Sequence, residues 1–140
     1  MILISHRGNI SGPDPEKENR LDYIQSALDQ GYDVEIDVWA SKKIWLGHDG
    51  PQYECPMNFL VKNFRKLWIH CKNIDSLEIL TEVKMLNIFW HEEDDYTLTS
   101  KNFIWTYPGK QVCNKSVLVV DDATNYAGPP CFGLCSDYLL

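Results

Sequence analysis

Two histidines, an arginine and two carboxylates stand at or near the ends of short apolar runs in this sequence: His6, Arg7, Glu35, Asp37 and His48. Side chains alternate along a strand, so Glu35 and Asp37 share one face, about 6–7 Å apart, and can converge on one divalent cation. Hard carboxylate oxygens suit Mg²⁺ or Ca²⁺. Arg7 adds a forked donor that suits a phosphate. These residue types are the parts needed for metal-assisted cleavage of a phosphate ester.

The two histidines supply the proton transfers that such a cleavage needs. Imidazole titrates near neutral pH, so one ring can accept a proton from the attacking oxygen while the other donates one to the leaving alkoxide. The sequence leaves open whether His6 or His48 takes each role. Asp49 is expected to cap or orient the turn that carries His48 rather than to bind metal.

The composition is that of one globular domain. The chain has 140 residues, 44% hydrophobic and 24% charged, which is enough to bury a core. Its net charge of −7 comes from 13 basic and 20 acidic side chains. A domain this acidic has no general attraction for nucleic acid or anionic membrane, so we expect neither as a partner. A small anionic substrate would need a local positive charge or a metal.

The apolar runs and the cysteines indicate the cellular compartment. No run approaches the length of a transmembrane helix, and residues 1–7 are too short and too poor in basic residues for a signal peptide. The five cysteines are an odd number, so we expect reduced thiols in a cytoplasmic protein. Cys131 and Cys135 could form half of a zinc site, but no second pair has matching spacing.

The hydrophobic pattern predicts strands that alternate with helices in the first half. Asn19 is expected to cap a helix over 20–30, and Asn73 one that reaches about residue 86 with an apolar stripe from Ile74 to Val83; a short helix is expected over 57–64. Strands are expected at 2–6, 33–39, 43–46, 67–72, 88–90, 103–106, 117–120 and 132–135. The alternation predicts parallel β-α units, whereas later connections are too short for full crossover helices.

In this order the motifs resemble those of the glycerophosphodiester phosphodiesterases, within the wider group of phospholipase C-like phosphodiesterase barrels. The matching stretches span nearly the whole chain: His6-Arg7-Gly8, Glu18-Asn19, Glu35-Ile36-Asp37-Val38, Gly47-His48-Asp49, Ile69-His70-Cys71-Lys72, Ile104-Trp105-Thr106 and Gly133-Leu134-Cys135-Ser136-Asp137.

The resemblance implies a (β/α) barrel with its site at the carboxyl ends of the strands. It implies acid–base catalysis by His6 and His48, and phosphate contact by Arg7. Glu35 and Asp37 would be metal ligands. Lys72 is expected either to contact the phosphate or to form a structural ion pair.

The chain departs from the family pattern at two points. The family's third metal ligand is usually a glutamate two residues before the lysine, and His70 stands there instead, either as a ligand or as a packed neutral histidine. An imidazole would weaken Mg²⁺ or Ca²⁺ binding or favour Mn²⁺ or Zn²⁺. The chain is also far shorter than the roughly 250 residues of such a barrel. We therefore expect residues 1–140 to form one shortened but closed TIM-like (β/α) barrel with several outer helices missing, and a homodimer that covers exposed strands.

The sequence thus predicts a metal-dependent phosphodiester hydrolase that acts on a glycerophosphodiester-like small or lipid-derived substrate. One alternative is a phosphate-binding module that has lost turnover, motivated by His70 and the short chain. Another is a lyase-type lipid phosphodiesterase that yields a cyclic phosphate. The acidic run 91–95 is expected to be mostly solvated, Trp105 to be either a pocket wall or core, and Glu18 to make polar contacts beneath the site.

Overall fold

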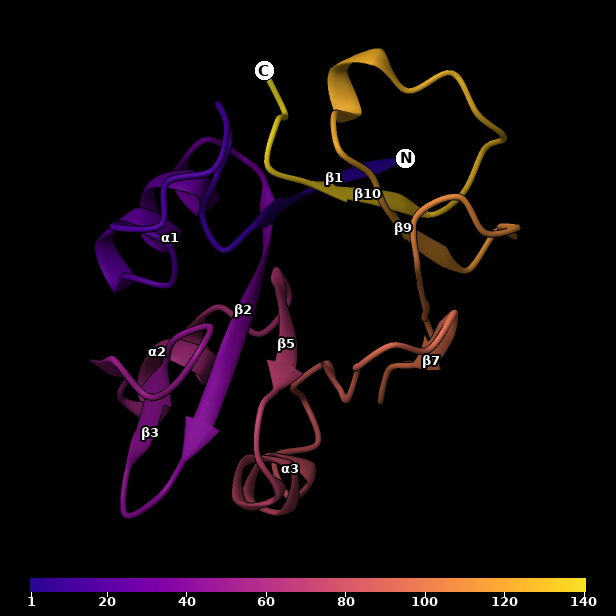
Figure 1. The fold of residues 1–140 in the computed structure, drawn as a ribbon. Coiled ribbons are helices and arrows are strands. Elements are labelled where there is room, and N and C mark those ends of the chain that lie inside the picture. Colours follow the sequence, from indigo (N-terminus) through magenta and orange to yellow (C-terminus); the bar gives the residue numbers. More distant parts are fainter.

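The computed structural model describes all 140 residues as one curled sheet of ten strands with three helices (Figure 1). The helices are α1 (Leu21–Asp29), α2 (Met57–Lys62) and α3 (Ile74–Thr81), and none has the length and apolar character needed to cross a bilayer. The strands are β1 (Ile2–His6), β2 (Asp33–Ala40), β3 (Ile44–Leu46), β4 (Tyr53–Glu54), β5 (Leu67–Cys71), β6 (Ile88–Phe89), β7 (Tyr96–Leu98), β8 (Ile104–Thr106), β9 (Ser116–Val119) and β10 (Gly133–Ser136).

Most of the sheet is parallel. Parallel ladders join β6, β5, β2, β1, β10, β9 and β8 in that order. The antiparallel strands are β3, which pairs with the end of β2 and with β4, and β7, which pairs with β8. Strand β1 lies between β2 and β10, so the first and last strands of the chain are neighbours. The carboxyl ends of the parallel strands therefore meet at one mouth of the curl.

The sheet is not a closed barrel. Strands β6 and β8, at the two ends of the parallel series, form no ladder with each other. The two ends meet through side-chain and loop contacts instead, such as the bonds from Ser100 N to Ile88 O (2.8 Å) and from Thr97 Oγ1 to Trp90 O (2.8 Å), and the stacked rings of Phe89 and Trp105. The prediction of a closed barrel is wrong, because β6 has only two paired residues and the chain turns back antiparallel in β7 instead of crossing over.

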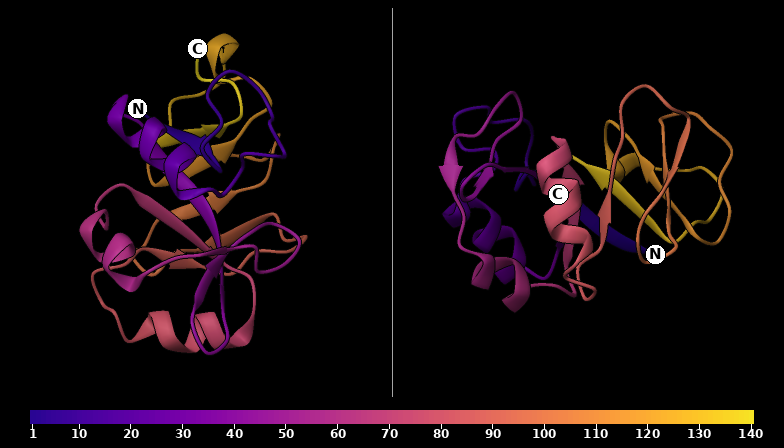
Figure 2. Two further views of the ribbon diagram at one scale, coloured as in Figure 1. Left: turned by 90° about the vertical axis from the view of Figure 1, so that its left-hand side faces the viewer. Right: turned by 90° about the horizontal axis from the view of Figure 1, so that it is seen from below.

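The helices cover only the first half of the molecule (Figure 2). All three pack beside β2, β5 and their neighbours, whereas the second half has one 3₁₀ turn, η1 (Ala123–Asn125), and otherwise loops. The prediction of an α/β fold with few helices is confirmed at this coarser level. It follows that the convex face of β8, β9 and β10 is covered by loops.

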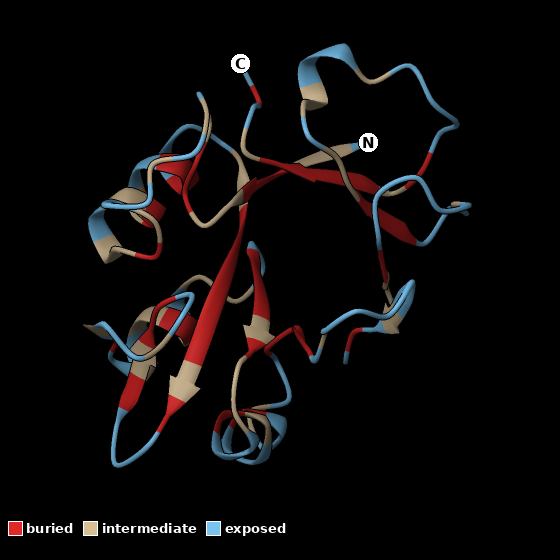
Figure 3. Ribbon diagram, in the orientation of Figure 1, coloured by how far each residue is buried: buried red, intermediate tan, exposed pale blue.

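Three hydrophobic clusters pack against the sheet: a large one on its outer face, one inside the curl, and a smaller one of Leu118, Cys131 and Leu134. Buried residues run along the central strands (Figure 3). The outer cluster joins the sheet to the helices, and the inner cluster fills the curl with the side chains of Ile4, Trp68, Phe89, Trp105, Val117 and Cys135. In β2, Val34, Ile36 and Val38 belong to the outer cluster. The alternation of side chains therefore turns Glu35 and Asp37 into the covered interior, where they are 3% and 0% exposed.

Two asparagines before helices behave differently. Asn73 caps α3 as predicted: its side chain accepts from Ser76 N (3.1 Å) and also bonds both backbone groups of Ala40. Asn19 does not cap α1, whose N-cap is the next residue and has no side-chain cap. Its side chain bonds Asp37 instead, so this prediction is wrong, and Asn19 belongs to the site.

Candidate functional site

The site residues expected from the sequence gather at the carboxyl-end mouth of the curl. A pocket of about 390 Å³ is lined by six of them: His6, Arg7, Glu35, His48, His70 and Lys72. The seventh, Asp37, is buried and contacts three of these lining residues. Residues up to 66 positions apart in the sequence therefore share one pocket.

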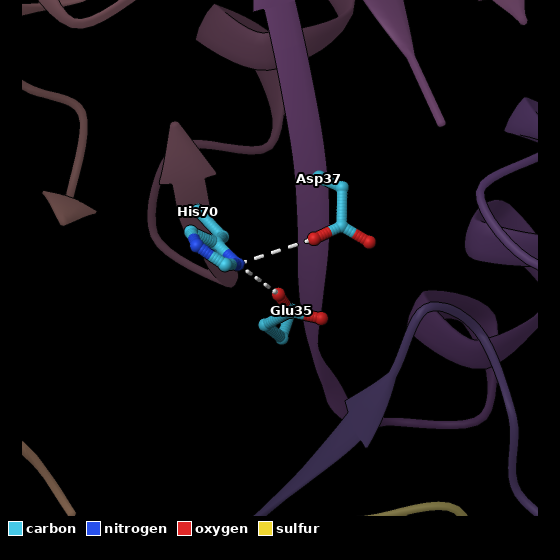
Figure 4. Close-up of side chains that lie close together, drawn as sticks. All are labelled: Glu35, Asp37 and His70. Atoms are coloured by element: carbon cyan, nitrogen blue, oxygen red, sulfur yellow. Dashed lines mark ion pairs between the residues drawn. The ribbon is translucent and has the colours of Figure 1, made fainter. Parts of the chain in front are cut away.

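Glu35, Asp37 and His70 form a compact group that could hold a metal ion (Figure 4). Asp37 on β2 and His70 on β5 are register partners, and the two acidic side chains lie one strand repeat apart. His70 Nδ1 is 3.2 Å from Asp37 Oδ1 and 3.8 Å from Glu35 Oε2. One potential ligand atom from each residue lies within 4.8 Å of the other two. The place that the resemblance assigns to a glutamate thus brings an imidazole to the two carboxylates.

The hydrogen bond on the far side of His70 fixes which nitrogen faces the carboxylates. His70 Nε2 lies 2.9 Å from the backbone oxygen of His91. A carbonyl can only accept, so Nε2 carries the hydrogen, and in the neutral ring Nδ1 presents a lone pair. A lone pair that faces two carboxylates is unfavourable unless a proton or a cation lies between them. Metal-ligating histidines commonly donate their other N–H to a backbone carbonyl in this way.

The carboxylates also have oxygen atoms without partners. Glu35 Oε1 and Asp37 Oδ1 are buried and make no hydrogen bond. Burial raises the pKa of Glu35, and the charge of Asp37 adds to this effect. Buried acceptors without a partner are costly and are rare in folded proteins. A cation in contact with both oxygens would offset that cost.

Asp37 is held from the other side by Arg7 and Asn19. Asn19 Nδ2 donates to Asp37 Oδ2 (2.9 Å), and Asn19 Oδ1 accepts from Asp37 N (3.0 Å). Arg7 Nε lies 2.9 Å from the same Oδ2 as an ion pair, although the angle is not that of a hydrogen bond. Burial alone would raise the pKa of Asp37, but His48 and His70 in their protonated forms, together with Arg7 and Asn19, outweigh it and hold that pKa well below its usual value. Asp37 is therefore an ionised, fixed carboxylate.

His6 is oriented by Asp137, a residue from the other end of the chain. His6 Nδ1 lies 2.8 Å from Asp137 Oδ1, which also accepts from Asn9 Nδ2 (2.9 Å). His6 Nε2 is 3.8 Å from Glu35 Oε1, inside the pocket. Burial lowers the pKa of His6, but the bond to Asp137 and the charge of Glu35 raise it above 6.5 overall. Asp137 stands in a motif that the sequence analysis quoted without assigning it a role; its place directly after the last strand was the available signal.

Arg7 links the first histidine motif to the second. Its backbone adopts φ 59, in the left-handed region, immediately after β1. Its Nη2 lies 2.6 Å from His48 Nδ1, and its Nη1 bonds Glu18 (3.3 Å). A guanidinium only donates, so His48 Nδ1 accepts, and Nε2 carries the hydrogen in the neutral ring. Asp49 lies 3.5 Å from His48 Nε2 and is not part of the carboxylate group.

Lys72 and Trp105 complete the lining. Lys72 is half-buried and has no carboxylate within 4.0 Å, so the alternative of a structural ion pair is not observed. Its ammonium group is the cation in this pocket that no other side chain engages. Trp105 is 4% exposed and stacks on Phe89 at 4.6 Å between ring centroids. Trp105 is thus both core and pocket wall.

Comparisons of this chain with models of protein families, with curated proteins and with solved structures give no match. The resemblance of the motifs therefore stays a prediction. What the geometry defines is a pocket with a potential metal-binding group at its base and basic side chains around it. Its chemistry has to be argued from these residues.

Proposed function

We propose that this protein is a metal-dependent phosphodiester hydrolase that acts on a glycerophosphodiester-like small or lipid-derived substrate, on an opened and shortened form of a (β/α) barrel. One observation carries the proposal. Two buried carboxylate oxygens, Glu35 Oε1 and Asp37 Oδ1, have no hydrogen-bond partner, and Asp37 Oδ1 faces the lone pair of His70 Nδ1. The pocket beside them also contains three further histidines, an arginine and a lysine. Acidic ligands suit a cation, and basic groups around them suit an anion that bridges the cation and the protein.

The two carboxylates suit Mg²⁺ or Ca²⁺, and the imidazole makes Mn²⁺ or Zn²⁺ suitable as well. A bound cation would supply a Lewis acid for the non-bridging phosphate oxygens. Lys72 has a free ammonium group to bind the phosphate, and Arg7 adds positive charge while it holds Asp37 and His48. His70 stands where the family usually has a third acidic ligand, and an imidazole can also bind a metal. The group therefore still has three potential ligands, which favours a catalytic site over a binding module.

The hydrogen bonds favour different proton roles for the two histidines. His6 donates from Nδ1 to Asp137 and so keeps Nε2 as an acceptor in the pocket, which is the arrangement of a general base whose tautomer a carboxylate holds. His48 accepts from Arg7 at Nδ1 and keeps its hydrogen on Nε2, so it can donate to the leaving oxygen. We assign His6 as the base and His48 as the acid.

The test is turnover of glycerophosphocholine and bis(p-nitrophenyl) phosphate by purified protein with Mg²⁺, Ca²⁺, Mn²⁺ or Zn²⁺, and with EDTA. We expect metal-dependent hydrolysis that Asp37→Asn and His6→Asn abolish, with exposed Glu93→Gln as the matched control. Phosphate binding without turnover in every cation would instead indicate a binding module. A cyclic product in phosphorus NMR would indicate a lyase. Failure to bind any of the four cations would refute the proposal.

A further inference from the structure

The acidic run over residues 91–95 is mostly solvated, as expected, since residues 92–95 are exposed, and it forms a bend beside the pocket. Both carboxylate oxygens of Asp94 are engaged: Oδ1 accepts from Glu92 N (2.9 Å), and Oδ2 lies 3.0 Å from His91 Nδ1. His91 lines the pocket, and its side chain is only 18% exposed. Asp94 therefore holds an imidazole against the site.

The orientation of His91 leaves one ring atom free. Since a carboxylate accepts, Nδ1 carries the hydrogen that points to Asp94. The other ring nitrogen, Nε2, makes no hydrogen bond within the chain. The backbone oxygen of the same residue receives the bond from His70 Nε2. His91 thus supports the metal group through its backbone while its ring remains available to a ligand.

His91 lies on the opposite side of the metal group from His6 and Arg7. In the sheet, β1 ends in His6, β2 carries the two carboxylates, β5 carries His70, and His91 follows β6, in that spatial order. The two ester substituents leave a phosphorus atom in different directions. An in-line displacement places the attacking and leaving oxygens on opposite faces of phosphorus. With His6 and His48 assigned to these two oxygens, the substituent that stays on the phosphate leaves that line sideways, and His91 occupies the side across the metal group.

We propose that His91 determines specificity by hydrogen-bonding a hydroxyl-bearing substituent that remains on the phosphate, with Asp94 as its positioning residue; this inference rests on the proposed function. The surroundings favour a hydrophilic substituent, because Glu92, the residue next to His91, also lines the pocket. A substituent with hydroxyl groups can pair with the free Nε2, whereas a plain alkyl group would leave that nitrogen without a partner.

Two substitutions test the contributions of the two ring nitrogens of His91 separately. His91→Asn keeps an amide near the position of Nδ1 and the contact with Asp94, but it removes the group that faces the pocket. His91→Gln places its amide near the position of Nε2. The substrates are glyceryl p-nitrophenyl phosphate and ethyl p-nitrophenyl phosphate, which share a leaving group and differ only in the substituent that stays.

We expect His91→Asn to lower kcat/KM for the glyceryl ester about 10-fold, the effect of one hydrogen bond, with less than about 2-fold change for the ethyl ester. His91→Gln should keep most of the glyceryl preference, Asp94→Asn should lose part of it, and Glu93→Gln should keep all of it. Mn²⁺ affinity should be unchanged in His91→Asn, because the backbone bond to His70 is retained.

Equal losses on both esters, weakened Mn²⁺ binding, or no change in either rate would each overturn the role of His91 while the hydrolase proposal stands. A wild-type protein that cleaves neither ester in any cation would defeat the proposed function, and this inference with it.

Discussion

Replacing Glu35 by glutamine should have opposite effects on stability with and without metal. Glutamine keeps the size of the side chain, removes a charge that burial penalises, and offers an amide N–H₂ to the neighbouring Asp37 carboxylate. The raised pKa of Glu35 means that its ionised form destabilises the metal-free fold at neutral pH. We expect the metal-free variant to be more stable by about 1–2 kcal/mol, the cost of an uncompensated buried polar group.

That difference is measurable as a melting temperature. At about 2.1 cal/mol/K per residue, the entropy of unfolding of a 140-residue chain is about 0.3 kcal/mol/K, so the variant in EDTA should melt about 3–7 °C higher. With metal at 100 times its Kd, the wild-type protein should gain about 2.7 kcal/mol, or about 9 °C. The variant should lose that gain, because one ligand is missing.

The assay is thermal unfolding followed by circular dichroism in EDTA and across a Mn²⁺ titration. Exposed Glu93→Gln is the control for removing one negative charge, and it should follow the wild type in both conditions. A Glu35→Gln protein that melts below the wild type in EDTA would contradict this expectation, since the carboxylate would then be a stabilising ion-pair partner. A variant that keeps the full Mn²⁺-induced rise would contradict it equally.

Individual side-chain contacts lead to three further predictions. The His6–Asp137 pair stabilises the fold fully when the pH lies below the ordinary pKa of histidine, 6.5, and above that of aspartate, 3.8. This contribution is lost as the pH rises through the raised pKa of His6 or falls through the lowered pKa of Asp137. Asp137→Asn should therefore lower the His6 titration midpoint in NMR of the EDTA-treated protein, and an unchanged midpoint would contradict this. Iodoacetamide should modify Cys113 first, because it is the one exposed thiol and a serine hydroxyl lowers its pKa, whereas labelling spread over all five thiols by mass spectrometry would oppose the structure. Asn73→Ala should cost about 2 kcal/mol in urea unfolding, since it removes a helix cap and the two bonds to Ala40, and a loss below about 0.5 kcal/mol would show those bonds to be unimportant.

The grouping of the site residues was predictable because it depends on local rules. Alternation along β2 turns Glu35 and Asp37 inward, and parallel strands bring their carboxyl ends to one mouth, so His6 and His70 reach the same pocket. The extent of most strands follows from the same apolar pattern. Asp137 obeys the rule as well, since it follows the last strand directly.

Other features depend on distant contacts that no local pattern reveals. Asn19 precedes an apolar stripe, which is typical of a cap, but its backbone adopts φ 67 and its side chain pairs with Asp37. The helix expected to reach residue 86 ends at Thr81, because the chain must turn there to enter β6. Ile74, at the start of the expected apolar stripe, is 69% exposed. The prediction of a closed barrel was wrong for a similar reason. Closure requires β6 and β8 to pair, and the local sequence of neither strand determines its pairing partner.

The bond between His6 and Asp137 joins residues 131 positions apart, and strand β1 is enclosed by β2 and β10. His6, which we propose as the general base, can therefore be oriented only after the final strand has docked beside the first. A partly folded chain that lacks β10 would have its carboxylates in place but a freely rotating imidazole. Recovery of the proposed enzymatic activity during refolding should accordingly lag behind recovery of β2–β5 pairing. The rate at which activity returns would then report the docking of β10 beside β1.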